Sequence, residues 1–344
     1  MDKLKELYEL NLKASDRVAI WMHVNPDPDA IGTSLGLSWL LKKKYGIESD
    51  IFHDGAISHP ENRSLLNVLS LSFKTPQEYE NEKSNFKVVA TVDCTHKNTG
   101  HKIPNPDIII DHHRVKVDAS KHKFLMVDPH AGAASSLIFE LIKESEFDFT
   151  EEDATVSTAL LFGILTDTNN LLAETVSDID FEAFSYFRER ANLSWIQEIR
   201  SYPIPSYFFQ YEAIASDEEN KNEWNGTLIS FLGSLSAQRR GVLPYIADRL
   251  MRKEATDTTV IMAIIDNHLE ASVRSKKVSL DVNEFVHTIF GEEYSGGKRG
   301  SGGAKVPMGF FQLPEDSNEL KDKIIDVTKN MIVLKIKREI IKDG

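Results

Sequence analysis

Histidine and aspartate residues gather in the stretch 23–29, directly after the apolar run 18–22, which we expect to be a buried strand. His23, Asp27 and Asp29 are separated by two prolines that stiffen the loop and keep a helix from starting before Asp29. In open α/β sheets, ligands bind at the carboxyl ends of strands. Neutral imidazole together with carboxylates suits a divalent metal of the manganese, iron or zinc kind. The alternative is a polar turn in which Asp29 merely caps the following helix.

Further acidic and imidazole groups follow later apolar runs. Asp93 follows the run 86–92, the triplet Asp111-His112-His113 follows the run 107–110, and Asp167 ends a helix-like run. Because parallel strands share one carboxyl edge, we expect these groups to converge. Each has a local alternative: Asp93 as a cap, Asp111 as an orienting group for an imidazole, and Asp167 in an Asx turn.

Together these groups exceed what one structural zinc ion needs. Buried acids at this density repel one another unless cations neutralise them. Two metal ions about 3.5–4 Å apart would do so and would generate hydroxide for attack at phosphorus. The residues therefore predict hydrolysis of a phosphoester.

Strands and helices alternate in the first part of the chain. This alternation predicts an α/β fold with a parallel sheet, flanking helices and right-handed crossovers. The expected strands are 18–22, 48–53, 86–92, 107–110 and 124–127. The expected helices are 3–14, 30–44, 60–71, 133–145, 151–166 and 178–199.

The amino-acid composition of the chain changes near residue 225. We expect a catalytic domain over 1–200, a linker over 201–224, and a smaller α/β domain over 225–344. The elements expected in the smaller domain are strands 227–232, 258–265, 268–274 and 309–313 and helices 243–253 and 316–328. The glycine-rich tract 295–303 is the strongest loop signal.

Composition limits the class of partner. The chain has 344 residues, 41% of them hydrophobic, and no run long enough to span a bilayer. Its N-terminus predicts no signal peptide, and the single Cys94 fits a reducing, cytoplasmic location. The net charge of −13 disfavours long nucleic acid but allows a small anionic substrate.

The ordered motifs over residues 15–200 resemble the DHH phosphoesterase superfamily, named for the triplet seen here at 111–113. The matching motifs are His23-x-Asn-Pro-Asp27-Pro-Asp29, Val92-Asp93, Asp111-His112-His113 and Gly163-Ile-Leu-Thr-Asp167. The resemblance implies one metal ion, usually manganese, held by His23, Asp27 and Asp93. It implies a second ion held by Asp29, Asp93, His112 and Asp167, so that Asp93 bridges. It also implies that His113 contacts the scissile phosphate. Asp111 would contact the residues around the metal ions without binding a metal ion itself.

The second part resembles the family's DHHA1 domain, which binds the far end of the substrate. The residues that carry this role by resemblance are Arg274, Ser275, Gly296, Gly297, Lys298, Arg299, Gly302 and Gly303. The family's Gly-Gly-Gly-His pattern lacks its histidine here, although glycine N–H groups can still cradle a phosphate. The resemblance implies an active site in the cleft between the domains, which would gauge substrate length. The alternative for the tract is a flexible surface loop.

The resemblance implies hydrolysis of very short 5′-phosphorylated RNA to nucleoside monophosphates by metal-bound hydroxide. A nucleoside 3′,5′-bisphosphate is a second expected substrate, and a homodimer is a possible assembly. The family's pyrophosphatases, with a different C-terminal domain, and its long-strand exonuclease fit less well. The alternatives are a linear or cyclic dinucleotide phosphodiesterase in second-messenger turnover and a catalytically silent nucleotide sensor. A structural zinc protein is disfavoured because such sites prefer cysteine.

Overall fold

The computed structural model describes residues 3–309 and 318–342, which fold into two compact units. The first unit comprises Met1–Ile57 and Glu61–Tyr202, and the second comprises Ser58–Pro60 and Pro203–Gly344. The short segment Ser58–Pro60 therefore belongs to the second unit although it lies within the sequence of the first. Among the described residues, no helix is both long and apolar enough to cross a membrane.

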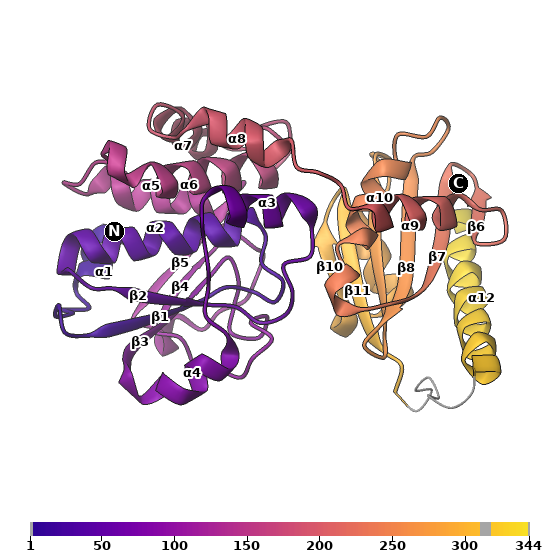
Figure 1. Ribbon diagram of the computed structural model, residues 1–344, viewed down its shortest axis with the longest axis horizontal. Coiled ribbons are helices and arrows are strands. Elements are labelled where there is room, and N and C mark those ends of the chain that lie inside the picture. Colours follow the sequence, from indigo (N-terminus) through magenta and orange to yellow (C-terminus); the bar gives the residue numbers. More distant parts are fainter. Residues whose placement is uncertain (1–2, 310–317, 343–344) are drawn as a thin grey trace. The chain divides into compact units, whose positions relative to one another are not determined.

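The first unit is built on a five-stranded parallel sheet in the order β2-β1-β3-β4-β5 (Figure 1). Its strands are β1 (Arg17–Trp21), β2 (Ser49–Phe52), β3 (Phe86–Val92), β4 (Ile108–Asp111) and β5 (Phe124–Val127). The predicted parallel sheet is therefore confirmed, and each predicted strand lies within two residues of an observed one. Since all five strands run the same way, their carboxyl ends lie along one edge of the sheet.

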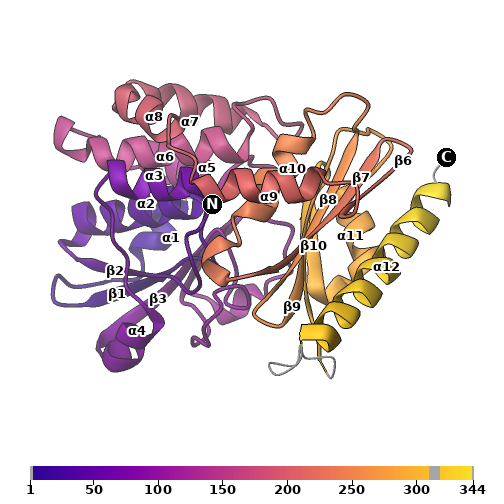
Figure 2. The same cartoon turned by 45° about the vertical axis from the view of Figure 1, so that its right-hand side comes forward.

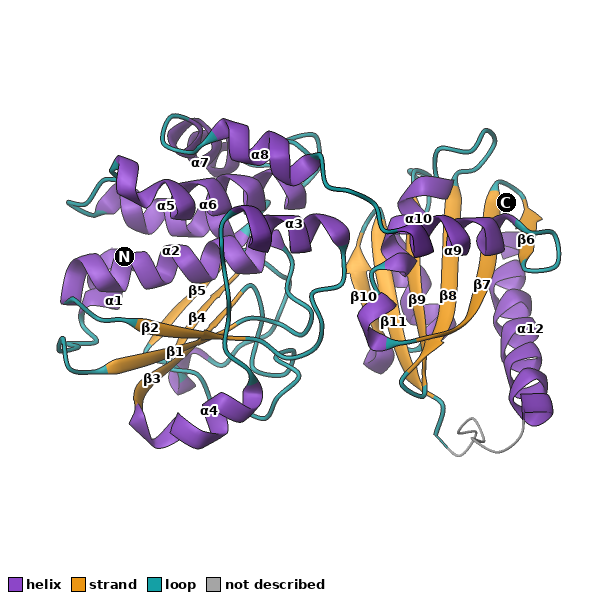
Figure 3. Cartoon of the chain, in the orientation of Figure 1, coloured by secondary structure: helices purple, strands orange, loops and turns teal. Residues whose placement is uncertain are grey.

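Helices flank both faces of this sheet, as Figure 3 shows for α2, α5 and α6 on one side and α4 on the other. The helices of the unit are α1 (Lys3–Tyr8), α2 (Pro28–Tyr45), α3 (Pro60–Val68), α4 (Pro76–Glu82), α5 (Ala134–Glu144), α6 (Ala154–Asp167), α7 (Asp178–Arg188) and α8 (Leu193–Arg200). Short 3-10 turns lie at η1 (Lys83–Asn85), η2 (Ala119–Lys121) and η3 (Glu151–Asp153). The larger core lies under α2, α5 and α6 and includes Leu37, Ile138 and Leu160. A smaller core on the opposite face contains Trp21 and Tyr79.

Helix α2 begins earlier than the sequence suggested. We expected Asp29 as the N-cap, but the helix begins at Pro28 and Asp27 is the cap, accepting hydrogen bonds from the backbone N–H groups of Asp29 and Ala30. The expectation was wrong because proline is well tolerated in the first helical turn, where its missing N–H has no intrahelical partner anyway. The cap change leaves the Asp29 side chain available for other contacts.

Two other predicted helices differ in length. The helix expected over 3–14 ends at Tyr8, and the one expected over 178–199 is divided into α7 and α8. The division occurs where Asn192 caps α8 by accepting from the N–H groups of Ser194 and Trp195. Asparagine competes with helical backbone bonds in this way, which favours a new start over continuation.

The second unit is built on a six-stranded mixed sheet in the order β10-β11-β9-β8-β7-β6 (Figure 3), which Figure 2 shows from a second direction. Its strands are β6 (Lys221–Trp224), β7 (Thr227–Leu235), β8 (Thr258–Ile265), β9 (His268–Ser275), β10 (Ser295–Lys298) and β11 (Ser301–Pro307). Its helices are α9 (Ser206–Ser216), α10 (Val242–Leu250), α11 (Val282–Phe290) and α12 (Asn318–Lys342), with short turns η4 (Ala237–Arg239) and η5 (Glu292–Tyr294). Strand β8 is buried on both faces: Val260 and Met262 enter one core and Ile261 and Ala263 the other.

Several expectations for this unit need correction. The glycine tract forms the antiparallel hairpin β10–β11 instead of a loop, because β11 pairs with β9 along its whole length. Residues 201–224, expected as a linker, contain α9 and β6. The helix expected over 316–328 is described from Asn318 and continues to Lys342. Most of the strand expected over 309–313 lies outside the described residues.

Candidate metal centre

One group of side chains joins the ends of β1 and β3. His23 follows β1, and its Nε2 atom lies 3.7 Å from Asp27 Oδ2 and 3.6 Å from Asp93 Oδ2. The other ring nitrogen of His23, Nδ1, lies 3.0 Å from the carbonyl oxygen of Val24. A hydrogen bond there fixes the tautomer and leaves Nε2 facing the carboxylates. His23, Asp27 and Asp93 thus offer three ligand atoms within 4.8 Å of one another.

A second group lies beside the first. His112 Nε2 lies 3.0 Å from Asp167 Oδ2 and 3.9 Å from Asp29 Oδ2. Its Nδ1 atom lies 3.1 Å from the carbonyl oxygen of Ala131, which again directs Nε2 toward the acids. Asp29, His112 and Asp167 form a further set of ligand atoms within 4.8 Å.

Asp93 lies between the two groups. Its Oδ1 atom is 3.4 Å from His112 Nε2, while Oδ2 faces His23. The residue is 2% exposed, and its backbone is left-handed, with φ +54°. A positive φ is uncommon for a residue with a side chain and often marks a functional position. The backbone N–H of Asp93 donates to the carbonyl of Ile110 at 2.8 Å, which holds this turn against β4.

Asp29 makes contacts that the local sequence does not reveal. Its two carboxylate oxygens accept from the backbone N–H groups of Ala134 at 2.6 Å and Ser135 at 2.9 Å, at the start of α5. The N-cap position of α5, Ala133, has no side-chain cap of its own. Because a helix N-terminus stabilises negative charge, α5 both orients Asp29 and favours its ionised form.

His113 and Asp111 lie at the margin of the cluster. His113 Nδ1 lies 2.8 Å from Asp111 Oδ1, and the backbone N–H of His113 donates to the same oxygen at 3.0 Å. Asp111 is fully buried, whereas the His113 side chain is 43% exposed, against 4% for His112. His113 Nδ1 also lies 3.5 Å from Asp93 Oδ1. Of these two neighbouring imidazoles, His113 is the one that an external molecule can reach.

The charges in the cluster shift one another's pKa values strongly. Burial would lower the pKa of His23, but its close contact with Asp27 and the charges of Asp27 and Asp93 outweigh this and raise the pKa to about 10. Burial, followed by the charges of Asp93 and Asp167, raises the pKa of Asp29 to about 7. Burial and the charge of Asp27 likewise raise the pKa of Asp93. A cation among these acids would relieve the repulsion.

Two buried atoms of the cluster support such a cation. Asp93 Oδ1 and His112 Nε2 are shielded from solvent and have no hydrogen-bond partner among the described residues. A buried polar atom without a partner is destabilising unless something else satisfies it. Imidazole nitrogens and carboxylate oxygens are the ligands that manganese, iron and zinc accept. The residues therefore fit divalent cations.

The residues expected to bind substrate lie in the second unit. Arg274 pairs in register with Ser301, so the end of β9 lies directly beside the glycine hairpin. The Arg274 guanidinium donates to Asp248 Oδ1 at 2.7 Å, to Ser272 Oγ at 3.1 Å and to the carbonyl of Val273 at 3.0 Å. These contacts hold the guanidinium in one orientation.

The structure also places the other residues of this set. Ser275 Oγ lies 2.9 Å from Thr258 Oγ1, so the two hydroxyl groups form a hydrogen bond with each other within the sheet. The glycines pair across the hairpin, Gly296 with Gly303 and Gly297 with Gly302. Lys298 ends β10, and Arg299, in the turn of the hairpin, donates to the carbonyl of Val278 at 3.1 Å.

Sequence reasoning missed His59. This residue belongs to the second unit, where burial is the main cause that lowers its pKa to about 4; the charge of Asp248 raises the pKa slightly and that of Arg274 lowers it further. Its imidazole is therefore neutral at physiological pH and lies near Arg274. No motif surrounds His59 in the sequence, so only the tertiary structure identifies it.

The parallel sheet with imidazole and carboxylate groups along its carboxyl edge defines a metal-binding α/β domain. Residues 17–179 match the model of the DHH family, N-terminal domain. Most of the first unit is therefore similar to the N-terminal domain of the DHH family.

Relatives extend this finding. The chain is 31% identical over 324 residues to an uncharacterised protein of Methanocaldococcus jannaschii, an alignment that covers 93% of this chain and 64% of the relative. It is 27% identical over 168 residues to a Streptococcus thermophilus protein named "Probable manganese-dependent inorganic pyrophosphatase", covering 48% of this chain and 52% of that one. The chain thus spans only part of the curated relatives that it matches.

A solved structure shares the fold of almost the whole chain. It is the crystal structure of an exopolyphosphatase-related protein from Bacteroides fragilis, with a TM-score of 0.69. The match covers 96% of this chain and 97% of that one, at 16% sequence identity. At this identity the likeness establishes the fold alone, for both the parallel-sheet part and the second sheet.

Gly163 of α6 gives a testable link between packing and the metal centre. A methyl group there would lie 2.7 Å from Ser135 Oγ and 2.9 Å from the Cα atom of Asp29. Gly163→Ala should therefore displace Asp29, weakening metal affinity about 10- to 100-fold, as the loss of an orienting contact does, with overpacking costing about 1–3 kcal/mol. Metal titration and thermal unfolding measure the two effects. Gly296→Ala is the control, because its methyl group would meet no atom within 4 Å; equal metal affinity in both variants would disprove the link.

Proposed function

We propose that this protein is a metal-dependent phosphoesterase that hydrolyses short 5′-phosphorylated oligoribonucleotides to nucleoside monophosphates. Asp93 carries the proposal, since its two oxygens face His112 on one side and His23 on the other. One carboxylate shared by two ligand groups suits a pair of divalent cations, of which manganese is the best candidate. The same site could remove the 3′-phosphate of a nucleoside 3′,5′-bisphosphate.

When bound, two such cations would supply a water molecule of lowered pKa and positive charge at the reacting phosphate. The chain's own residues orient these groups. Asp111 positions the ring of His113 through Nδ1, so that the opposite nitrogen, Nε2, is the atom available to a phosphate oxygen. Burial lowers and the Asp111 and Asp93 contacts raise the pKa of His113, with a net increase. A protonated imidazole there would stabilise charge that develops on the phosphate.

The second unit supports the choice of an oligonucleotide. The hairpin lies at the edge of the sheet, and its glycine residues have no side chains to keep a phosphate away from the backbone. Arg274 lies in register beside this hairpin, and its planar guanidinium can bind a phosphate or stack on a base. We therefore assign Arg274, Lys298, Arg299 and the tract glycines to binding of the substrate away from the bond that is cleaved.

A second candidate is inorganic pyrophosphate hydrolysis. It is favoured by the sequence match to the Streptococcus thermophilus protein, which covers 48% of this chain. The chemistry at the metal centre would be the same for both candidates, so only a comparison of their substrates separates them. A dinucleotide phosphodiesterase of second-messenger turnover and a silent nucleotide sensor are the other outcomes.

A substrate panel tests the proposal. The full chain with manganese is assayed on 5′-phosphorylated di- to pentaribonucleotides, adenosine 3′,5′-bisphosphate, pyrophosphate, and linear and cyclic dinucleotides. We expect the highest kcat/KM on a 5′-phosphorylated oligoribonucleotide, with nucleoside monophosphate as product. A higher kcat/KM on pyrophosphate would replace the proposal by the second candidate, and the absence of turnover on the whole panel would favour the sensor.

Arg274→Ala should weaken substrate binding without disturbing the metal ions. Removing a charge-assisted hydrogen bond of about 1.5–3 kcal/mol should raise KM on a 5′-phosphorylated dinucleotide about 10- to 100-fold. Lys298→Ala should act in the same direction. Steady-state kinetics on the dinucleotide and on bis-p-nitrophenyl phosphate, a small ester lacking the extra phosphate and base, measure the difference.

Arg249→Ala is the matched control, because Arg249 is an exposed arginine of the same unit that pairs with Glu212. It should leave both KM values unchanged. If Arg274→Ala reduced hydrolysis of both substrates equally, the residue would support the fold or the metal centre, and its assignment to substrate binding would be wrong.

A further inference from the structure

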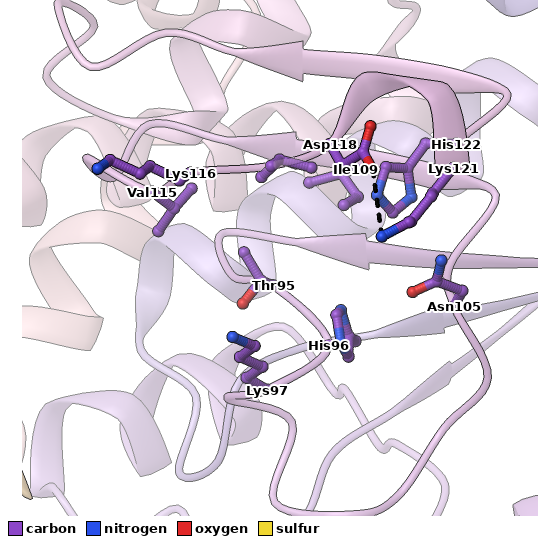
Figure 4. Close-up of a pocket in the computed structure, with 11 residues that line it drawn as sticks. Thr95, His96, Lys97, Asn105, Ile109, Val115, Lys116, Asp118, Lys121 and His122 are labelled. Carbon is purple, nitrogen blue, oxygen red and sulfur yellow. Dashed lines mark ion pairs between the residues drawn. The ribbon is translucent and has the colours of Figure 1, made fainter. Parts of the chain in front are cut away.

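The first unit contains a cavity of about 530 Å³, a volume typical of small-molecule sites. Its walls come from the loop after β3, from β4 and from the segment that includes η2 (Figure 4). The residues that line the cavity are Thr95, His96, Lys97, Asn105, Ile109, Val115, Lys116, Val117, Asp118, Lys121 and His122. None of the proposed metal ligands is among these lining residues.

The charged side chains around the cavity are mostly lysines. Lys97, Lys116 and Lys121 line it together with a single acid, Asp118, whose Oδ2 lies 3.1 Å from the ammonium group of Lys121. In the described part of the chain, neither Lys97 nor Lys116 has a carboxylate oxygen within 4 Å of its ammonium group. The cavity is therefore a positive region in a chain whose net charge is −13.

Some lysines of the same unit pair with an acid: Lys87 pairs with Asp16, and Lys123 pairs with Asp107, each at 2.8 Å. Lys97 and Lys116 have no such carboxylate partner among the described residues, and both line the same cavity. An anion in the cavity would provide the missing partner.

Two histidines, His96 and His122, also line the cavity. Burial, then the charges of Lys97 and His122, lower the pKa of His96. His122 Nδ1 lies 2.7 Å from the carbonyl oxygen of Pro106, so a proton on Nδ1 satisfies this contact. Imidazole rings beside lysines offer both flat surface and hydrogen-bonding nitrogen to an organic ligand.

The remaining wall is apolar. Ile109 is fully buried, and because side chains alternate along a strand, it lies on the face opposite Ile108 and Ile110, which pack in the main core. Val115 and Val117 add to this surface. Inorganic phosphate alone would make no use of such a wall, whereas an organic phosphate would.

We propose that this cavity binds a phosphate-bearing organic molecule of about nucleotide size, at a site separate from the metal centre. Lys97 and Lys116 hold the phosphate. Ile109, Val115 and Val117 contact the organic body. The loops that supply Lys97 and Val115 begin with Asp93 and with His112–His113, so the cavity and the metal centre share their supporting backbone.

Lysine footprinting on the intact, manganese-loaded chain tests the site without relying on activity. Reductive methylation of each lysine is followed by mass spectrometry with AMP, adenosine or inorganic phosphate present. AMP should slow methylation of Lys97 and Lys116 by about tenfold near saturation, as expected for ammonium groups held in charge-assisted hydrogen bonds. Lys102, an exposed lysine of the same loop outside the cavity, should react at an unchanged rate.

The other two probes separate the parts of the ligand. Adenosine lacks the anion and should protect neither lysine, and inorganic phosphate at the same concentration should protect them less than AMP. Equal protection by adenosine would overturn the role of the lysines, and equal protection by phosphate would overturn the role of the apolar wall. If AMP left both lysines fully reactive, the site itself would be disproved, whatever substrate the enzyme cleaves.

A charge-matched pair of variants provides a second readout. Lys97→Gln/Lys116→Gln should lose at least about tenfold in AMP affinity, measured by equilibrium dialysis, since each lost contact is a charge-assisted one. Lys102→Gln/Lys276→Gln removes the same charge from two exposed lysines outside the cavity and should bind AMP as the unaltered protein does. Equal AMP affinity in the two double variants would contradict the proposal. If the first double variant fails to fold, the footprint on the unaltered chain still tests the proposal.

Discussion

Asp93→Asn should lower kcat/KM on a 5′-phosphorylated dinucleotide by at least about 10³-fold, the scale of losing a key electrostatic group. The carboxylate faces His112 through Oδ1 and His23 through Oδ2, so the change removes one charge from both ligand groups at once. Asparagine keeps the size of the side chain and is among the residues that best tolerate the left-handed backbone, here with φ +54°. The fold should therefore survive while both metal sites weaken.

The measurement combines kinetics with metal content. Bound manganese, determined by mass spectrometry after gel filtration, should fall together with activity. Asp266→Asn is the matched control, because it makes the same chemical change at another aspartate with positive φ, in the turn between β8 and β9. A variant that kept more than about a tenth of the activity would show that Asp93 does not bridge, since the bridging role demands a far larger loss.

Removal of divalent cations should abolish activity and lower thermal stability, and manganese should restore both. Without cations the buried acids repel one another, as the raised pKa values of Asp29 and Asp93 indicate. Ligands that bind only the folded state stabilise it, so Tm should rise with the manganese concentration. Magnesium should restore activity no better than manganese, because imidazole ligands suit manganese more than magnesium.

Chelation, verified by metal analysis, followed by titration with each metal measures the effect on kcat and on Tm. The Tm readout is independent of the substrate, so it tests the metal centre even if the proposed substrate is wrong. Full turnover in excess chelator after verified removal would exclude a metal-dependent reaction. A Tm that did not respond to manganese would show that the folded protein does not bind this metal.

The first unit shows why local patterns predicted the parallel sheet so well. Strands β3 and β5 were predicted with the bounds that the structure shows, because short apolar runs between polar turns have few alternatives to a buried parallel strand. Once the strands are parallel, Asp93, Asp111 and His112 have to lie along one edge. The convergence of these residues is thus a consequence of topology, and the alternation of strands and helices predicts that topology.

The second unit shows where local patterns fail. A tract of five glycines among nine residues predicts a loop by composition, yet residues 296–298 and 301–303 lie in β10 and β11. Pairing of β11 with β9 supplies hydrogen bonds that intrinsic propensity does not anticipate, and β-propensity depends strongly on context. The position of α9 within the expected linker has a similar cause, since Phe208 is buried in the core of the second unit.

By itself, the sequence determined the identity, order and strand-end placement of the groups that could bind metal, because prolines and apolar runs act over a few residues. Only the tertiary structure decided how those groups are held. Asp29 receives its hydrogen bonds from Ala134 and Ser135, more than a hundred residues away, and His59 lies in the short segment Ser58–Pro60 that joins a unit otherwise starting at Pro203. Such contacts form when whole elements pack together, and the free energy that selects them comes from burial of surface that no local window of sequence contains.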